Sequence, residues 1–277
     1  MRTAGDAATA QVAARPGARQ DRRVRIVTFN IRHGLGPDGR CDARRLAAAV
    51  RALDPDILAL QEVDRRQPRS GFTDQARICA EAMGAVDHRF VPTVAGWMSV
   101  PGLRWRARGR ERYPAYGIAL ASRFPVRAWR HWRLPLASRW AGPVQLGVDE
   151  PRAAVAADVG TPSGTITVCA THLSSRLGNA WAQLPWLRDA LSGAPRPVVL
   201  TGDLNLRDTA PVQQIGWRPP AATPTPTFPV ERPRFQIDHV LVDDDGQLRV
   251  TGEPRAVDTG LSDHRALVVD VSLTPRA

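Results

Sequence analysis

Residues 198–205 read VVLTGDLN and join an apolar run directly to two polar side chains. The apolar and β-branched residues predict a strand, and Asp203 and Asn205 follow it two positions apart. Residues two apart in an extended chain point to the same side, so both side chains are expected to reach one ion or one water. We expect the strand to end where these side chains begin, which would spare them burial. Taken alone, Gly-Asp-x-Asn suits a simple turn equally well.

The rest of the chain alternates strand-like runs with amphipathic helical patterns. Strands are predicted at residues 24–29, 57–60, 118–122, 153–159, 165–171, 197–202, 238–242 and 266–273, and helices at 42–53, 74–84 and 181–191. Asp42 and Thr73 or Asp74 are the expected N-caps, Gly84 the expected stop, and Pro185 predicts that the third helix is short or kinked. Such alternation over 277 residues predicts an α/β sandwich.

The domain organisation follows from composition. Residues 1–22 are poor in large apolar side chains and predict a disordered tail, although a start codon assigned too early would explain them equally well. Residues 23–277 show no change in composition and no internal repeat, which indicates one domain. We expect a monomeric, cytoplasmic protein without a transmembrane segment, because no apolar run reaches eighteen residues and the N-terminus lacks the core of a secretory signal. The three cysteines, which show no zinc spacing, are expected to be reduced thiols.

The net charge of +11 comes wholly from arginine, because the sequence contains no lysine. A basic surface attracts phosphates. The run RWRARGRER at 104–112, with Trp97 and Trp105 nearby, is the best candidate for a loop that faces phosphate or nucleic acid. A solvated charged loop is the alternative. We expect residues 92–114 and the proline-rich 217–235 to form long surface loops.

Polar side chains recur at the ends of the predicted strands. They are Asn30, Glu62, His172, Asp203 with Asn205, Asp238 with His239, and Asp263 with His264. In α/β sheets ligands gather at strand ends, because loops there carry polar groups that the core does not accept. A carboxylate such as Glu62 beside amide oxygens is what a hard divalent cation prefers, although a Glu after a strand is often only solvated.

These residues lie in motifs that resemble, in order and spacing, the endonuclease/exonuclease/phosphatase superfamily. The motifs are TFNI, LQEVD, YGIALASR, EPRAA, THLSS, GDLN, TFP followed by QIDHVLV, and LSDHRAL, spread over residues 24–273. The resemblance implies a four-layer α/β sandwich, with two packed mixed β-sheets flanked by helices. It also implies attack of an activated water on a phosphate ester, with Mg²⁺ or Mn²⁺ as cofactor.

The resemblance also implies a role for each matching residue. Glu62 would be the principal metal ligand, with Asn30 beside it and Asp263 close to the metal. Asp203 and Asn205 would position the water and the scissile phosphate, and Arg152 would contact the phosphate. His264, oriented by Asp238, would bind the phosphate or act as base. His172 would stabilise the transition state or protonate the leaving oxygen.

Substrate choice stays open at this stage. Where many relatives have Asn after the Gly of YGIALASR, this chain has Ile118, so one phosphate or sugar ligand is missing or supplied elsewhere. The basic composition favours a nuclease, whereas the absence of a separate nucleic-acid module favours a phosphomonoesterase or a lipid-headgroup phosphodiesterase. A non-catalytic phosphate- or nucleic-acid-binding protein on the same fold is the alternative outside enzymes.

Overall fold

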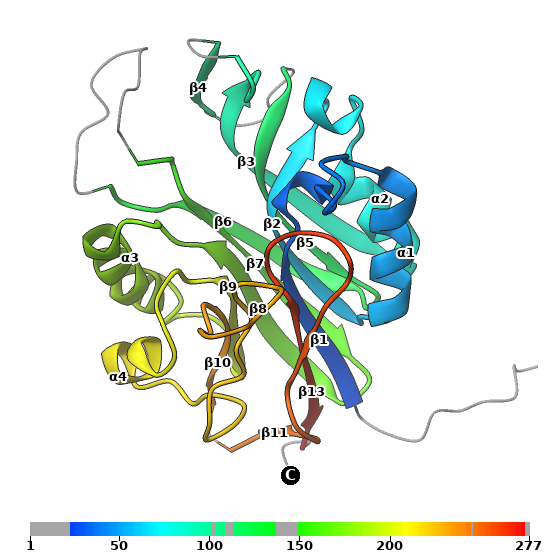
Figure 1. The fold of residues 1–277 in the computed structure, drawn as a ribbon. Coiled ribbons are helices and arrows are strands. Elements are labelled where there is room, and N and C mark those ends of the chain that lie inside the picture. Colours follow the sequence, from blue (N-terminus) through cyan, green and yellow to red (C-terminus); the bar gives the residue numbers. More distant parts are fainter. Residues whose placement is uncertain (1–22, 101–102, 109–112, 137–148, 245, 275–277) are drawn as a thin grey trace, which may run out of the picture.

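The computed structural model describes residues 23–100, 103–108, 113–136, 149–244 and 246–274. The predicted tail at 1–22 and parts of the arginine-rich segment lie outside these residues. The chain forms two mixed β-sheets with helices on their outer faces, which confirms the predicted α/β sandwich (Figure 1).

The first sheet has eight strands in the order β11-β13-β1-β2-β5-β3-β4, with β12 pairing to β13. Only β1 and β2 run parallel in it. Its strands are β1 (Arg23–Asn30), β2 (Ile57–Arg65), β3 (Asp87–Gly96), β4 (Arg104–Arg106), β5 (Ala115–Ser122), β11 (Leu248–Val250), β12 (Arg255–Val257) and β13 (Ala266–Leu273).

The second sheet has five strands in the order β10-β9-β8-β7-β6, and its parallel pair is β8 with β9. Its strands are β6 (Val126–Arg133), β7 (Ala153–Thr161), β8 (Gly164–His172), β9 (Val198–Asp203) and β10 (Asp238–Asp243). The helices are α1 (Ala43–Leu53), α2 (Gln75–Met83), α3 (Leu177–Ala190) and α4 (Ala210–Ile215), with short 3₁₀ turns η1 (Arg32–Gly34) and η2 (Pro68–Ser70).

Strand alternation divides the apolar side chains into three cores. In β1, Val24 and Ile26 face the core between the sheets, whereas Val27 and Phe29 face α1 and α2. On the other sheet, Leu200 of β9 belongs to the third core, which lies under α3 and α4. Both faces of the central strands are therefore buried, as their almost continuous apolar runs require.

The helix ends follow the sequence. The Asp42 carboxylate accepts hydrogen bonds from the Arg44 and Arg45 amides at 2.7 and 3.2 Å and caps α1, and Asp74 caps α2 in the same way. Gly84 adopts the left-handed conformation that ends α2. All three predicted caps and stops are confirmed.

Pro185 does not shorten α3, which corrects that part of the prediction. The helix runs for 14 residues through the proline. A proline lacks the N–H that would bond the carbonyl four residues earlier, here that of Trp181. That carbonyl accepts the side-chain amide of Gln214 from α4 instead, so no backbone acceptor is lost.

The segment 92–114 is not one long loop, because it holds the end of β3 and all of β4. The sequence pattern did not predict β3, because Pro92 lies within it. Pro92 sits where the register between β3 and β5 shifts, at a bulge that tolerates the missing N–H. Strand β6 was also missed, because this edge strand is rich in arginine and largely exposed on one side.

Gly202 of β9 stands against the backbone of β8. Its φ is +147°, and an added Cβ would lie 2.0 Å from the Thr171 carbonyl oxygen. A glycine has no side chain to block this approach, and the close contact brings the ends of β8 and β9 together.

We expect Gly202→Ala to lower the free energy of unfolding by about 3 kcal/mol or more, because the clash is with backbone and the conformation is strained. Urea unfolding followed by circular dichroism measures the change. Gly193→Ala is the control, since nothing lies within 4 Å of its added Cβ. Equal unfolding midpoints for the two variants would contradict the argument.

Candidate active site

Asp203, the last residue of β9, lies at the centre of the polar cluster. Its Oδ2 accepts a hydrogen bond from Asn30 Nδ2 at 3.0 Å. His172 Nε2 is 3.4 Å from the same oxygen, and His264 Nε2 is 3.8 Å from it. Residues from the ends of β1, β8 and β9 and from the loop before β13 therefore meet at one carboxylate oxygen.

Asn205 reaches the same cleft by a route that the sequence argument did not predict. Its φ is +52°, so the chain is not extended here and the two-residue alternation does not apply. The turn lets the Asn205 amide N–H donate to Asp203 Oδ1 at 3.0 Å, while its side-chain Nδ2 donates to the Leu173 carbonyl at 3.1 Å. The turn at Asn205 is therefore itself part of the site, because it brings the Asn205 amide to the Asp203 carboxylate.

Asp203 is buried, contrary to the expectation that the strand end would spare it. Only 2% of its surface is exposed. Burial, and secondarily the neighbouring Asp238, raise the pKa of Asp203 to about 7. A carboxylate that takes up protons near neutral pH is suited to act as a general base.

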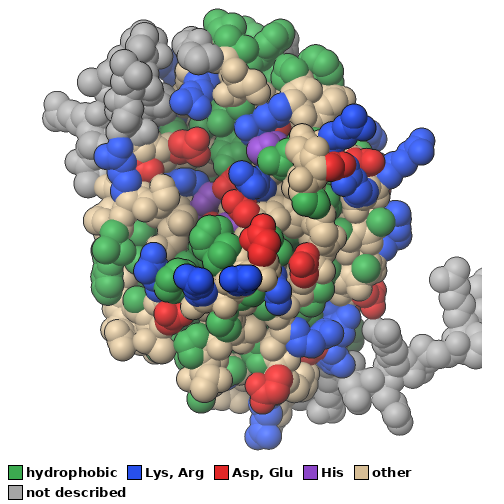
Figure 2. Space-filling model, in the orientation of Figure 1, with side chains coloured by type: hydrophobic (Ala, Val, Ile, Leu, Met, Phe, Trp, Pro, Cys, Tyr) green, Lys and Arg blue, Asp and Glu red, His purple; other side chains and the backbone are tan. Residues whose placement is uncertain are grey.

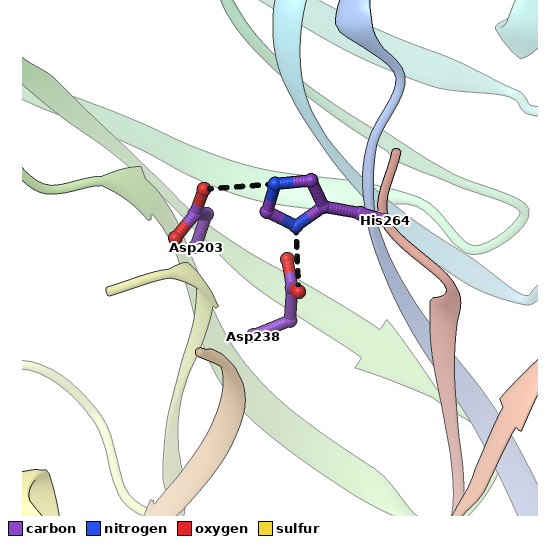
Figure 3. Close-up of side chains that lie close together, drawn as sticks. All are labelled: Asp203, Asp238 and His264. Atoms are coloured by element: carbon purple, nitrogen blue, oxygen red, sulfur yellow. Dashed lines mark hydrogen bonds and ion pairs between the residues drawn. The ribbon is translucent and has the colours of Figure 1, made fainter. Parts of the chain in front are cut away.

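Asp238 and His264 form a buried hydrogen-bonded pair beside Asp203, with the imidazole between the two carboxylates (Figure 3). His264 Nδ1 is 2.9 Å from Asp238 Oδ2, which also accepts from Thr227 Oγ1 at 2.7 Å. Burial lowers the pKa of His264, but the two carboxylates outweigh it and raise the pKa to about 10. The ring is therefore an imidazolium at neutral pH, and it also packs against Phe228.

His172, unlike His264, is held in its neutral form. Arg152 Nη1 lies 2.9 Å from His172 Nδ1, and because a guanidinium only donates, Nδ1 must accept. The ring proton is then on Nε2, which points toward Asp203. Burial, together with the charges of Arg152 and His264, holds the pKa of His172 well below its usual range. His172 is a neutral hydrogen-bond donor.

Glu62 reaches the cleft because β2 contains a bulge. The register with β5 shifts between Leu60 and Val63, and Glu62 has a φ of +57°. The bulge turns the carboxylate toward Asn30, whose Nδ2 donates to Glu62 Oε1 at 3.2 Å. Burial raises the pKa of Glu62.

The donor set fits a hard divalent cation. One amide nitrogen, Asn30 Nδ2, contacts the carboxylates of both Glu62 and Asp203, so two partly or fully buried acids lie close together. Asp263 is nearby, since Ser262 Oγ donates to the Asn30 carbonyl and to Asp263 Oδ1. Burying such acids is costly unless positive charge offsets it, and oxygen ligands are those that Mg²⁺ and Mn²⁺ prefer.

A second arrangement is also close enough to hold an ion. Ligand atoms of Asp203, Asp238 and His264 all lie within 4.8 Å of one another. However, His264 is already bonded to Asp238 and positively charged, which disfavours a cation there. Asp238 Oδ1, which has no hydrogen-bond partner among the described residues, favours an ion on that side. The oxygen donors on the Glu62 side of Asp203 are the better candidate for a cation, because no charged histidine stands between them.

These side chains line an open cleft of about 580 Å³. Figure 2 shows acidic, histidine and arginine side chains near the middle of this face. Of the residues singled out from the sequence, Glu62, Arg152, His172, Asp203, Asn205, Asp263 and His264 line the cleft, and Asn30 and Asp238 lie behind them.

Two positions lie elsewhere. His239 faces away from the cleft, with Nε2 2.8 Å from the Leu206 carbonyl oxygen. Ile118 belongs to the core between the sheets, so it takes no part in ligand binding.

Sequence reasoning missed several lining residues. Glu150, Arg176 and Phe228 were assigned no role, although Glu150 lies in EPRAA, Phe228 lies in TFP and Arg176 directly follows THLSS. Thr227 was missed too, although it opens the TFP motif and donates to Asp238. A hydroxyl beside a buried acid has no signature that a single sequence reveals.

Comparisons with known proteins identify the group to which these features belong. The model of the Endonuclease/Exonuclease/phosphatase family matches residues 27–264. The uncharacterized protein YbhP of Escherichia coli (strain K12) is 26% identical over 275 residues, which cover 93% of this chain and all of YbhP.

Solved structures agree. An endonuclease/exonuclease/phosphatase from Beutenbergia cavernae aligns with a TM-score of 0.71 and 27% identity over 91% of this chain and 72% of that one. The mannosyl-6-phosphatase of Bacteroides thetaiotaomicron aligns with a TM-score of 0.61 and 16% identity over 90% and 100% of the two chains.

The tautomer of His172 is testable by ¹⁵N NMR of the imidazole rings. We expect an unprotonated Nδ1 and a protonated Nε2 in the native protein. Arg152→Met should raise the pKa of His172, because it removes a nearby positive charge. Arg104→Met, on the distant strand β4, is the control and should leave the ring unchanged. A protonated Nδ1 in the native protein would contradict the assignment.

The buried acids predict how pH affects stability without metal. The folded-state pKa of Asp203 is above its unfolded value, so its ionisation removes stability as the pH rises from about 4 toward 7. Asp203→Asn lacks this loss. We measure the melting temperatures of both proteins in EDTA at pH 5 and pH 8. The melting temperature of Asp203→Asn minus that of the native protein should be larger at pH 8 than at pH 5. Added Mg²⁺ should raise the native value more than that of the variant. A pH-independent difference would argue against the buried charge.

Proposed function

This chain belongs to the endonuclease/exonuclease/phosphatase family, and on that premise we propose that it hydrolyses phosphate esters by metal-dependent attack of water on phosphorus. The observation that carries the proposal is the buried Asp203, whose Oδ2 faces Asn30, His172 and His264 within 4 Å. Proteins of this family are in general phosphoesterases that depend on divalent metals. The relative with mannosyl-6-phosphatase activity supports ester hydrolysis and leaves phosphomonoesters among the possible substrates.

Each side chain then has a distinct task. Asp203 accepts the proton of the attacking water, while the Asn205 amide fixes the orientation of the carboxylate. His264, kept charged by Asp238, donates to a phosphate oxygen and offsets the negative charge that develops there. His172 donates through Nε2 to another phosphate oxygen. Because its pKa is low, we assign it hydrogen bonding rather than proton transfer to the leaving group.

The metal would be held by Glu62, with Asn30 and Asp263 beside it. When bound, Mg²⁺ or Mn²⁺ would neutralise charge on the phosphate and lower the pKa of water. Arg152 donates to His172 and lies 3.9 Å from Glu150, so it fixes the His172 tautomer and adds positive charge at the cleft wall. Neither role requires the metal to be present.

A non-catalytic binding protein is the weaker proposal. Binding phosphate alone would favour cations in the cleft, whereas this one buries Asp203 and Asp238 and half-buries Glu62. Buried carboxylates repel phosphate and destabilise the fold unless they hold a metal or move a proton. The buried carboxylates therefore support a catalytic rather than a purely binding role.

Activity is measured as p-nitrophenol release from bis-p-nitrophenyl phosphate with Mg²⁺ or Mn²⁺. We expect Asp203→Asn and His264→Gln each to lower the rate by about 10²–10⁴-fold, since each removes a proton acceptor or a charged donor. EDTA should abolish the activity.

Two matched substitutions control for nonspecific effects. Asp189→Asn on α3 and His88→Gln on β3 replace exposed residues of the same types and should leave the rate unchanged. Equal rates for the native protein and the two cleft variants would refute the proposed reaction.

A further inference from the structure

The β3–β4 hairpin carries exposed apolar side chains at an edge of the first sheet, and neither the fold nor the cleft chemistry requires them. Its tip comprises Trp97, Met98, Val100 and Leu103 among the described residues. Leu103 is 52% exposed and Trp97 44%, while Met98 and Val100 are half-buried. Exposed apolar clusters of this kind mark interaction sites.

The hairpin projects beyond the cleft at the same end of the molecule. Strand register places Arg65, Ala115, Ala95 and Trp105 in one row across β2, β5, β3 and β4. Glu62 stands three residues before this row, about 10 Å along the strand, and Trp97 two residues after it, about 7 Å farther. Figure 1 shows the hairpin at the top of the molecule, and Figure 2 shows hydrophobic side chains at that end.

Several backbone groups of the tip are paired within the protein. Trp97 N donates to the Leu103 carbonyl at 2.8 Å, and the Val100 and Leu103 amides donate to Trp97 and Val100 carbonyls at 3.2 Å. The buried side chain of Gln67 fixes the base, donating to the Gly96 carbonyl at 2.8 Å and accepting from Met98 N at 3.0 Å. Each paired backbone group lowers the cost of placing the tip in an apolar medium.

Arginines follow the apolar tip on β4. Arg104 and Arg106 flank Trp105, and the sequence has no acidic residue between Asp87 and Glu111. Aromatic side chains and arginines just behind an aliphatic tip are the arrangement found at the interface of anionic membranes. The net charge of +11 acts in the same direction.

We propose that the β3–β4 tip docks the protein on an anionic phospholipid surface. Leu103, Val100 and Met98 distinguish this partner from single-stranded nucleic acid, whose bases stack on aromatic rings and gain little from aliphatic side chains. A second copy of the chain is disfavoured, since two tips of like charge repel each other. Four side chains also fall short of the roughly 800 Å² per partner of a stable interface.

Cosedimentation with vesicles in EDTA tests the docking separately from hydrolysis. We expect the native protein to bind phosphatidylcholine vesicles that contain phosphatidylglycerol at least about tenfold more tightly than vesicles of phosphatidylcholine alone. Leu103→Asp should weaken binding to the anionic vesicles by roughly tenfold or more. The double variant Arg104→Gln, Arg106→Gln should lose most of the preference for anionic lipid.

Val86→Asp is the matched control, because Val86 is 65% exposed and precedes the opposite end of β3. It should bind like the native protein. Leu103→Asp should also hydrolyse bis-p-nitrophenyl phosphate at the native rate, which shows that it is folded.

No sedimentation of the native protein, or equal sedimentation of native protein and Leu103→Asp, would overturn the proposal. So would binding of oligothymidylate, lost in Leu103→Asp, without binding of vesicles. Vesicle binding by a protein inactive on the chromogenic ester would refute the proposed hydrolysis and leave the docking intact.

Discussion

A carboxylate buried where two sheets meet is the constraint on which this site depends. Asp203 at the end of β9 is stabilised in the folded state only because Asn30, Asn205 and the two histidines surround it. Each of these contacts comes from a different segment. The sandwich brings the ends of β1, β8 and β9 together at this carboxylate. Burial of its charge costs stability, and the same burial raises the pKa of Asp203 to about 7.

The two histidines differ in charge because their Nδ1 atoms have different partners. His264 Nδ1 contacts the carboxylate of Asp238, whereas His172 Nδ1 contacts the guanidinium of Arg152. The first ring is charged and the second is neutral, yet both direct Nε2 at Asp203. A phosphate entering the cleft would meet one charged and one neutral donor, and this asymmetry follows from two neighbouring residues rather than from the histidines.

The sequence predicted which segments carry the site but not how they are folded. Apolar runs located the central strands, because both faces of those strands are buried. The bulge at Glu62 could not be predicted, since a glutamate gives no signal for a left-handed residue. A turn at Asn205 was one of two interpretations of GDLN, and the sequence did not decide between that turn and an extended chain. Burial of Asp203 and Asp238 could not be predicted either. An acid at a strand end is expected to be exposed unless a loop covers it, and the loops that carry Thr227 and His264 are known only from the structure.

The edges of the sheets depart furthest from the sequence pattern, and this has a physical basis. A central strand is under packing constraints on both faces, so its composition reports its structure. The β3–β4 hairpin packs on one side only, and Pro92, Gly96 and the arginines of β4 are compatible with either a loop or a strand. Because packing does not determine its outer side chains, exposed Leu103 and Trp97 are evidence about a partner in a way that a buried leucine is not. We therefore expect the centre of the sandwich to carry the chemistry and the sheet edge to carry the contact with a partner.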